Sequence, residues 1–312
     1  MKTPNSFFNN IASETIFLYS KNDVSVYMKR EDLLHQYVSG NKFRKLKYNI
    51  LEAQETNKRT LLTFGGAFSN HISATAYAGK ICGFKTIGII RGDELGRNIS
   101  QTLKTNEPLQ FAHNNGMAFK FISREDYRKK HDPEFIEALK NEFGNFYLIP
   151  EGGTNPNAIK GCREILQAND EKFNYICTAV GTGGTILGIL NSIDNHQTVL
   201  GFPALKGDFL NDTIKKQFND TSKCRFIEKY HFGGFAKVNE ELILFINVFK
   251  KRFNIQLDPI YTGKMMFGID EMISSNYFKK GTSILAIHTG GLQGIAAMNS
   301  KLRKKGLSQI KN

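Results

Sequence analysis

Short apolar runs rich in β-branched residues recur along the chain and alternate with longer amphipathic segments. The short runs are typical of buried strands, which predicts strands at 24–28, 61–64, 86–90, 118–122, 147–149, 176–179, 199–202 and 283–288. The longer segments repeat apolar residues at helical spacing, which predicts helices at 42–55, 70–82, 133–143, 157–168, 240–253 and 264–274. Strands that alternate with helices favour parallel sheets covered by helices, an α/β architecture. Ligands in such folds bind beyond the carboxyl ends of strands, so we examine those junctions for chemistry.

A glycine-rich turn follows the predicted strand at 176–179. Its residues are Gly181, Thr182, Gly183, Gly184 and Thr185. Glycines let backbone amides approach an anion, and the start of the following helix attracts phosphate. Position 186 is Ile, so the G-x-G-x-x-G dinucleotide fingerprint is incomplete, and the turn has no P-loop lysine. We therefore favour the phosphate of a mononucleotide-sized cofactor over a ligand-free turn.

Two further segments carry candidate chemistry. Ser69 is placed to cap a helix that begins at Asn70, and the absence of G-x-S-x-G gives no support to a hydrolase triad. Lys42 begins an amphipathic helix, where the positive helix end disfavours an ammonium and favours an amine able to form a Schiff base. The neighbouring Arg44, Lys45 and Lys47 are expected to be solvated charges. A Schiff-base lysine, a phosphate turn and a Ser-Asn turn are together the parts that hold pyridoxal 5'-phosphate.

Composition narrows the remaining function classes. The chain has 312 residues and a net charge of +13, but its basic residues are spread out and no nucleic-acid motif occurs, so we expect no nucleic-acid partner. The four cysteines form no C-x-x-C pair and the seven histidines no H-E-x-x-H, so we expect no metal. No apolar run of about 18 residues and no signal peptide occur. We expect no membrane partner and a cytoplasmic location.

Five sequence blocks appear in an order that resembles one enzyme family. They are KREDLLHQYVSGNKFRKL at 29–46, GGAFSNH at 65–71, GTGGT at 181–185, DPIYTGKMM at 258–266 and HTGG at 288–291. The set resembles the D-cysteine desulfhydrase and 1-aminocyclopropane-1-carboxylate deaminase family. The resemblance implies a tryptophan synthase β-like, fold type II protein with two open parallel-sheet domains, and a homodimer. Residues 1–50 and 150–312 would form the large cofactor-binding domain, 51–149 the small α/β domain, with the active site in the cleft between them.

The resemblance also implies which residues bind the cofactor. Lys42 would carry pyridoxal phosphate covalently and move protons at the substrate Cα. Asn70 would hydrogen-bond the ring hydroxyl, and residues 181–185 would bind the phosphate. Thr262 or Thr289 would lie near the pyridine nitrogen and the substrate.

Two residues are implied to act on a small amino-acid substrate. Ser69 would hold its carboxylate or assist proton transfer, and Tyr261 would lie near the leaving group. One segment departs from the family: members commonly carry G-x-G-Y-G where this chain has Phe235 in the sequence GGFAK. A phenylalanine supplies no hydroxyl, so activity or substrate range is expected to differ.

The predicted reaction is β-elimination from D-cysteine, which gives pyruvate, hydrogen sulfide and ammonia. Ring-opening deaminases carry Glu and Leu where this chain has Thr262 and Thr289, so both positions follow the desulfhydrase pattern. The first alternative is 1-aminocyclopropane-1-carboxylate deamination to 2-oxobutanoate and ammonia. Another class of protein is also open, a non-catalytic protein that binds phosphorylated ligands through residues 181–185.

Overall fold

The computed structural model describes residues 2–9, 11–206 and 221–311. The chain divides into two compact units. The smaller unit is Met1–Ile11 with Lys45–Ala158, and the larger unit is Ala12–Arg44 with Ile159–Asn312. Each unit has its own sheet, and each sheet is mostly parallel, as the alternation of strands and helices predicts.

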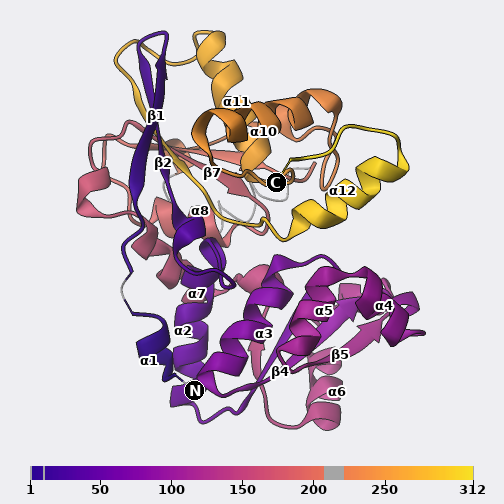
Figure 1. Cartoon of the computed structure of the whole chain (residues 1–312). Coiled ribbons are helices and arrows are strands. Elements are labelled where there is room, and N and C mark those ends of the chain that lie inside the picture. The colour runs from indigo at the N-terminus through magenta and orange to yellow at the C-terminus, as the bar shows by residue number, and fades with distance from the viewer. Residues whose placement is uncertain (1, 10, 207–220, 312) are drawn as a thin grey trace. The chain divides into compact units, whose positions relative to one another are not determined.

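The smaller unit is built on a four-stranded parallel sheet. Its strand order is β5 (Met117–Ile122), β4 (Lys85–Arg91), β3 (Thr60–Gly66), β6 (Tyr147–Ile149). Its complete helices are α1 (Pro4–Phe7), α3 (Asn70–Cys82), α4 (Ile99–Thr105), α5 (Glu107–Asn114) and α6 (Pro133–Phe143). Helices α3 and α5 pack on one face, where Ile90 of β4 contacts their apolar residues, and α6 packs on the other face with Ile87 and Ile89 (Figure 1). The carboxyl end of β3 thus leads directly into Ser69 and α3.

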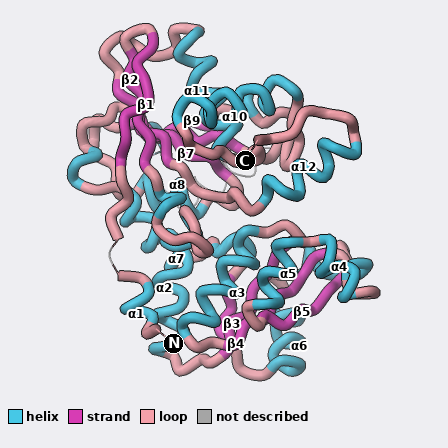
Figure 2. Tube along the Cα trace, in the orientation of Figure 1, coloured by secondary structure: helices cyan, strands magenta, loops and turns pink. Residues whose placement is uncertain are grey.

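The larger unit is built on a six-stranded sheet. Its strand order is β1 (Thr15–Lys21), β2 (Val24–Lys29), β10 (Ser283–Ile287), β7 (Tyr175–Val180), β8 (Thr198–Pro203), β9 (Cys224–Phe226). Only the β1–β2 pair is antiparallel within the described part of the chain, and Figure 2 shows it as a long hairpin. The helices are α8 (Gly184–Leu190), α10 (Glu240–Phe253), α11 (Thr262–Ser274) and α12 (Gly294–Lys304). Two more helices cross the unit boundaries in sequence, α2 (Asn41–Glu55) and α7 (Pro156–Cys162).

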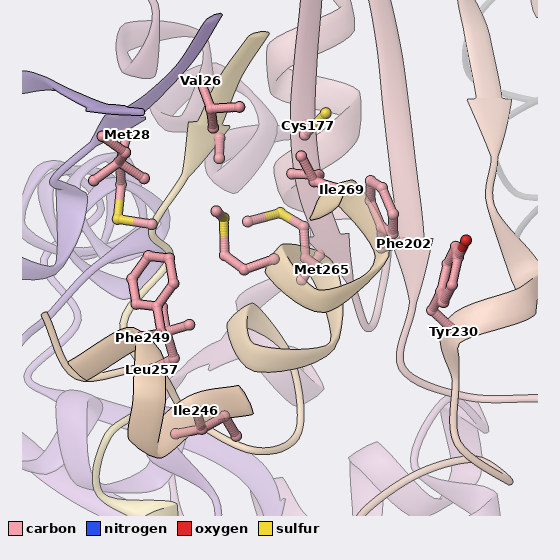
Figure 3. Packing of buried hydrophobic residues seen from close by; sticks show 14 of the residues in the cluster. Val26, Met28, Cys177, Phe202, Tyr230, Ile246, Phe249, Leu257, Met265 and Ile269 are labelled. Carbon is pink, nitrogen blue, oxygen red and sulfur yellow. The ribbon is translucent and has the colours of Figure 1, made fainter. Parts of the chain in front are cut away.

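Both faces of the larger sheet are covered, which explains the continuous apolar runs in its strands. Along β10, Ile284 and Ala286 belong to the core shared with α10, α11 and α12, whereas Leu285 and Ile287 belong to the core shared with α8. Figure 3 shows the first of these cores, in which Met265 of α11 lies among side chains from the sheet and from α10. This packing fixes α11, and therefore the residues at its amino end.

The predicted elements agree closely with the structure. All eight predicted strands are present, and helices α3, α6 and α10 have the predicted bounds to the residue. The helix predicted at 157–168 is wrong in length, because α7 ends at Cys162 and a short 3-10 turn, Arg163–Ile165, follows. Strands β1 and β9 were not predicted, since both lie at edges of the larger sheet and neither is a continuous apolar run; β1, for example, exposes Phe17.

Candidate active site

Lys42 is positioned by a close crossing of two backbone segments in the larger unit. Gly40 has φ +62°, and a Cβ built on it would lie 2.0 Å from the carbonyl oxygen of Thr289. The Asn41 amide donates to the same oxygen at 3.3 Å. Thr289 follows β10 by two residues, so this crossing holds the start of α2 beside the carboxyl end of a central strand. Only glycine permits such an approach at position 40.

A second contact ties the start of α2 to the glycine-rich turn. The Asn41 side-chain amide donates to Thr185 Oγ1 at 2.8 Å. Gly183 caps α8 in the left-handed conformation, with φ +89°, at the carboxyl end of β7. The structure therefore brings Lys42 and residues 181–185 into one neighbourhood of the larger unit. Lys42 itself is buried, with 8% of its surface exposed.

The basic residues that follow Lys42 are not solvated, so the expectation for Arg44, Lys45 and Lys47 is wrong. All three are buried. Arg44 donates to both carboxylate oxygens of Glu31 at 2.9 Å, and these bonds raise its pKa although burial opposes its charge. Lys45 donates to the Gly152 carbonyl and the Thr154 hydroxyl, each at 3.2 Å. These basic residues were predicted to be exposed because their hydrogen-bond partners belong to other segments of the chain and cannot be recognised from the local sequence.

A buried carboxylate organises the segment before α11. Asp258 is 1% exposed, and its oxygens accept hydrogen bonds from the amides of Ile260, Tyr261 and Thr262, each at 2.8 Å. It also accepts the Thr262 hydroxyl proton at 2.6 Å. A carboxylate at a helix start satisfies amides that have no partner within the helix. No role was predicted for Asp258, although it opens the quoted block at 258–266 and a D-x-x-x-T pattern before an apolar helix is a capping signal.

Asp258 fixes Tyr261 beside the glycine-rich turn. A Cβ on Gly181 would lie 3.2 Å from the Tyr261 ring and 3.4 Å from its hydroxyl oxygen.

The two candidate threonines, Thr262 and Thr289, differ in the hydrogen bonds that their hydroxyls make. The Thr262 hydroxyl hydrogen is committed to Asp258, whereas the buried Thr289 hydroxyl makes no hydrogen bond to the described residues.

The segment that carries Thr289 is held by His288, which is fully buried. The Gly290 amide donates to His288 Nδ1 at 3.2 Å, so Nδ1 acts as an acceptor. The proton of a neutral imidazole is then on Nε2, which donates to the Gln256 carbonyl oxygen at 2.7 Å. The ring thus accepts one hydrogen bond and donates another, and together these bonds orient the ring and the turn after β10.

Ser69 and Asn70 belong to the smaller unit. Ser69 is the N-cap of α3 and accepts from the Ile72 amide at 3.4 Å, as its position in the sequence predicts. A Cβ on Gly65 would lie 2.5 Å from Ile72 Cγ1, so glycine there allows the tight turn between β3 and α3. Asn70 is the first residue of α3. Their roles toward substrate and cofactor stay predictions.

The residues of the larger unit fit a phosphorylated aldehyde. A primary amine, that of Lys42, lies next to Asn41, whose side chain bonds Thr185 of the glycine-rich turn. The first amides of α8 have no acceptor within the helix, and the left-handed Gly183 leaves them without a shielding side chain. The donor set of this turn suits a phosphate, and the neighbouring amine suits a carbonyl carbon.

The described residues contain no group of three His, Cys, Asp or Glu side chains arranged to hold a metal ion. Among the same residues, no helix combines the length and the apolar character needed to cross a membrane.

Comparison with known proteins agrees with this donor set. A family described as pyridoxal-phosphate dependent enzyme matches residues 14–290. The chain is 30% identical over 298 residues to the mitochondrial bifunctional D-cysteine desulfhydrase/1-aminocyclopropane-1-carboxylate deaminase of Arabidopsis thaliana, which covers 88% of this chain and 74% of that protein. It is also 30% identical over 309 residues to a Thermotoga maritima protein provisionally named 1-aminocyclopropane-1-carboxylate deaminase, covering 91% and 94%.

Solved structures show the same fold. The structure of an ACC deaminase homologue superposes with a TM-score of 0.78 at 25% identity and covers 94% of both chains. A hydrogen sulfide-producing enzyme from Fusobacterium nucleatum superposes with a TM-score of 0.68 at 16% identity, covering 93% of this chain and 99% of that chain. The expected fold class, two open parallel sheets in a tryptophan synthase β-like arrangement, is confirmed.

Proposed function

The chain belongs to the family of pyridoxal-phosphate dependent enzymes, and we propose that its reaction is β-elimination from D-cysteine or a related β-substituted D-amino acid. Membership confirms two expectations, the cofactor pyridoxal 5'-phosphate and the enzyme class of pyridoxal-phosphate-dependent lyase. The balanced reaction converts D-cysteine and water to pyruvate, hydrogen sulfide and ammonia. The Cα–H and Cβ–S bonds break, sulfide departs with the Cβ–S electron pair, and water replaces the amino nitrogen.

The residues of the larger unit have the following proposed roles. Bound pyridoxal phosphate supplies a ring that withdraws electrons from the substrate Cα. Lys42 would hold the cofactor and take the Cα proton. Residues 181–185 would bind the phosphate, with Asn41 fixing the Thr185 hydroxyl at 2.8 Å. Tyr261, which Asp258 holds beside Gly181, would stand near the leaving group.

The residues of the smaller unit have proposed roles from the resemblance. Ser69 would bind the substrate carboxylate, and Asn70 would donate to the ring hydroxyl of the cofactor. The Ser69 hydroxyl already accepts from Ile72, so it keeps its own proton for donation to a carboxylate.

One observation supports elimination over ring opening: the side chain free to meet the pyridine nitrogen is neutral. Thr262 gives its proton to Asp258, which leaves Thr289 as the candidate partner of that nitrogen. A hydroxyl does not hold the nitrogen protonated as a carboxylate would, so the ring withdraws electrons less strongly. Weaker electron withdrawal by the cofactor suffices to expel sulfide, which is a good leaving group, whereas cleavage of a ring carbon–carbon bond requires stronger electron withdrawal.

Ring-opening deamination is the second candidate, because the names of the relatives support it equally. The Arabidopsis protein is named for both activities, and the Thermotoga protein for the deaminase. We therefore propose an assay of the purified holoenzyme with D-cysteine, L-cysteine and 1-aminocyclopropane-1-carboxylate. Sulfide and pyruvate from D-cysteine are expected. Efficient 2-oxobutanoate formation without sulfide from D-cysteine would overturn the choice, and so would an absence of keto acid from all three. The non-catalytic phospholigand-binding alternative is not kept, because the chain belongs to an enzyme family.

Assembly, location and domain roles also belong to the proposal. We propose a homodimer, which light scattering of the purified protein would test, and a cytoplasmic location, which fractionation of the source cells would test. The domain bounds 1–50 with 150–312, and 51–149, stay a proposal about which parts bind the cofactor.

A further inference from the structure

The Tyr261 ring has a second neighbour, Phe235, which is the residue at which this chain departs from the family sequence. Their ring centroids are 6.3 Å apart and the rings meet edge to face at 65°. Phe235 is 48% exposed, so packing around its own side chain does not fix it. Its position must therefore depend on the backbone that carries it.

That backbone is strained. In the 231–236 loop, Phe232 and Ala236 both have φ +54°, and between them Gly233 and Gly234 have φ +91° and +113°. A left-handed conformation costs a non-glycine residue about 1–2 kcal/mol. Phe232 and Ala236 therefore need contacts that hold the loop in place. One such contact is local, since the Gly233 amide donates to His231 Nδ1 at 2.9 Å.

Phe232 also packs edge to face on Phe267 of α11, with ring centroids 5.1 Å apart. The buried polar anchor is Lys264, three residues after Tyr261 in α11. Its ammonium donates to the carbonyl oxygens of His231 at 2.8 Å and Gly234 at 2.9 Å. The side chain is 2% exposed, and it forms no salt bridge within residues 2–9, 11–206 and 221–311. One helix thus carries both Tyr261 and the group that holds the loop bearing Phe235.

The residues that follow Lys264 in α11 are mostly apolar and buried. Met265 and Ile269 of α11 lie in the core, with Tyr230 nearby (Figure 3). Burial lowers the Lys264 pKa to about 8, and the negative charge of Asp258 opposes that shift. Asp258 acts on Lys264 electrostatically, and the segment that Lys264 contacts carries the titratable groups Tyr230 and His231. A buried cation is costly unless its donors are hydrogen-bonded, and both hydrogen bonds that Lys264 donates go to carbonyl oxygens of the loop.

We propose that Lys264 is a positioning residue, which holds the 231–236 loop so that Phe235 stays against Tyr261 and limits the size of the substrate side chain accepted there. The inference rests on the proposed function, because it takes Tyr261 as part of the substrate site. In this proposal Phe235, where the family commonly has tyrosine, brings an apolar ring in place of a hydroxyl group, and this ring fills space beside Tyr261.

The first test measures the loop without any substrate. In the holoenzyme, Lys264→Met keeps the length of the side chain but removes its donors, and Lys237→Met removes an exposed lysine from the same segment as a matched control. Hydrogen exchange followed by mass spectrometry should show amides 232–236 exchanging at least tenfold faster in Lys264→Met and unchanged in Lys237→Met. Equal exchange in both variants would overturn the proposal. If Lys264→Met does not fold, Lys264→Leu, which also lacks a donor, takes its place with the same expected result.

The second test measures the space beside Tyr261. D-Alanine and D-phenylalanine have no leaving group, so their dissociation constants, followed by the absorbance of the cofactor, report fit and not elimination. The ratio of Kd for D-phenylalanine to that for D-alanine should fall at least tenfold in Lys264→Met and in Phe235→Ala. The double variant should show no further fall, because Lys264 acts through Phe235. An unchanged ratio, no binding of either amino acid, or independent effects that multiply would each overturn the proposal.

The two proposals fail separately. Absence of sulfide release from D-cysteine would refute the proposed reaction, while faster exchange of the loop and a changed binding ratio would still support the positioning role of Lys264.

Discussion

Gly40→Ala tests the backbone crossing that places Lys42. A Cβ at this position would lie 2.0 Å from the Thr289 carbonyl oxygen and 2.7 Å from the Gly290 amide nitrogen. No rotamer relieves the overlap, because Cβ has a fixed position and both neighbours are backbone atoms. The two segments would have to separate by about 1 Å to reach ordinary contact distances.

The expected magnitude follows from comparison with Gly281→Ala. Gly281 also has a positive φ, +80°, but nothing lies within 4 Å of its Cβ position. Each variant places an alanine in the left-handed region, at a cost of about 1–2 kcal/mol. Gly40→Ala adds overpacking, which costs about 1–3 kcal/mol more. It also displaces Lys42, and a shift of about 1 Å in a reacting group lowers the rate roughly 100-fold.

The assay measures the free energy of unfolding by denaturant titration, and kcat/KM with the best substrate of the wild type. Gly281→Ala is expected to lose stability only. Gly40→Ala is expected to lose more stability and about 100-fold in kcat/KM. If the two variants have the same stability and activity, the crossing does not position Lys42 and the reasoning is refuted.

Four further variants test single residues. Borohydride reduction of the wild type should leave the cofactor label on Lys42 and none in Lys42→Ala; a label on Lys29 or Lys45 would contradict the assignment. Gly183→Val, at φ +89°, should raise the dissociation constant of pyridoxal phosphate at least tenfold, and an unchanged constant in a folded variant would place the phosphate elsewhere. Ser69→Asp should keep the helix cap and lose activity, whereas full turnover would leave Ser69 only its capping role. Between pH 8 and 10.5 the folded state binds fewer protons at Lys264 than the unfolded state, so the free energy of unfolding should rise with pH by up to about 3 kcal/mol; the same slope in Lys264→Met would refute the lowered pKa.

The sequence predicts much of the fold because its local signals agree with its packing. In β7 and β10 both faces are buried, so the strands are continuously apolar and are recognised without knowledge of the partner strand. Helix α6 is preceded by its N-cap Asp132 and followed by its C-cap Gly144, so its bounds are marked in the sequence itself. Strand β1 has neither signal, because it lies at the sheet edge and its burial alternates irregularly.

The candidate site was predicted by residue type but not by bonding. The glycines at 181, 183 and 184 predict a turn suited to an anion, and the position of Lys42 at a helix start predicts its role. The partner of Thr185, by contrast, is Asn41, which lies 144 residues earlier and has no periodic signal. Arg44 was misjudged for the same reason, since Glu31 neutralises it from another segment.

Thr262 and Thr289 show most clearly what tertiary structure adds. Both threonines lie within blocks that resemble the family, and the sequence alone offers no reason to prefer either as the partner of the pyridine nitrogen. Asp258 separates them, because a buried carboxylate that forms no salt bridge within the described residues is stabilised by the hydrogen bonds it accepts, and the Thr262 hydroxyl is one of its four donors. The same carboxylate that holds Tyr261 in place therefore uses the Thr262 hydroxyl proton, which Thr262 cannot then donate to the cofactor. The electron sink proposed for this enzyme depends on Thr289 for that reason, and the capping of α11 and the choice of reaction are linked through one aspartate.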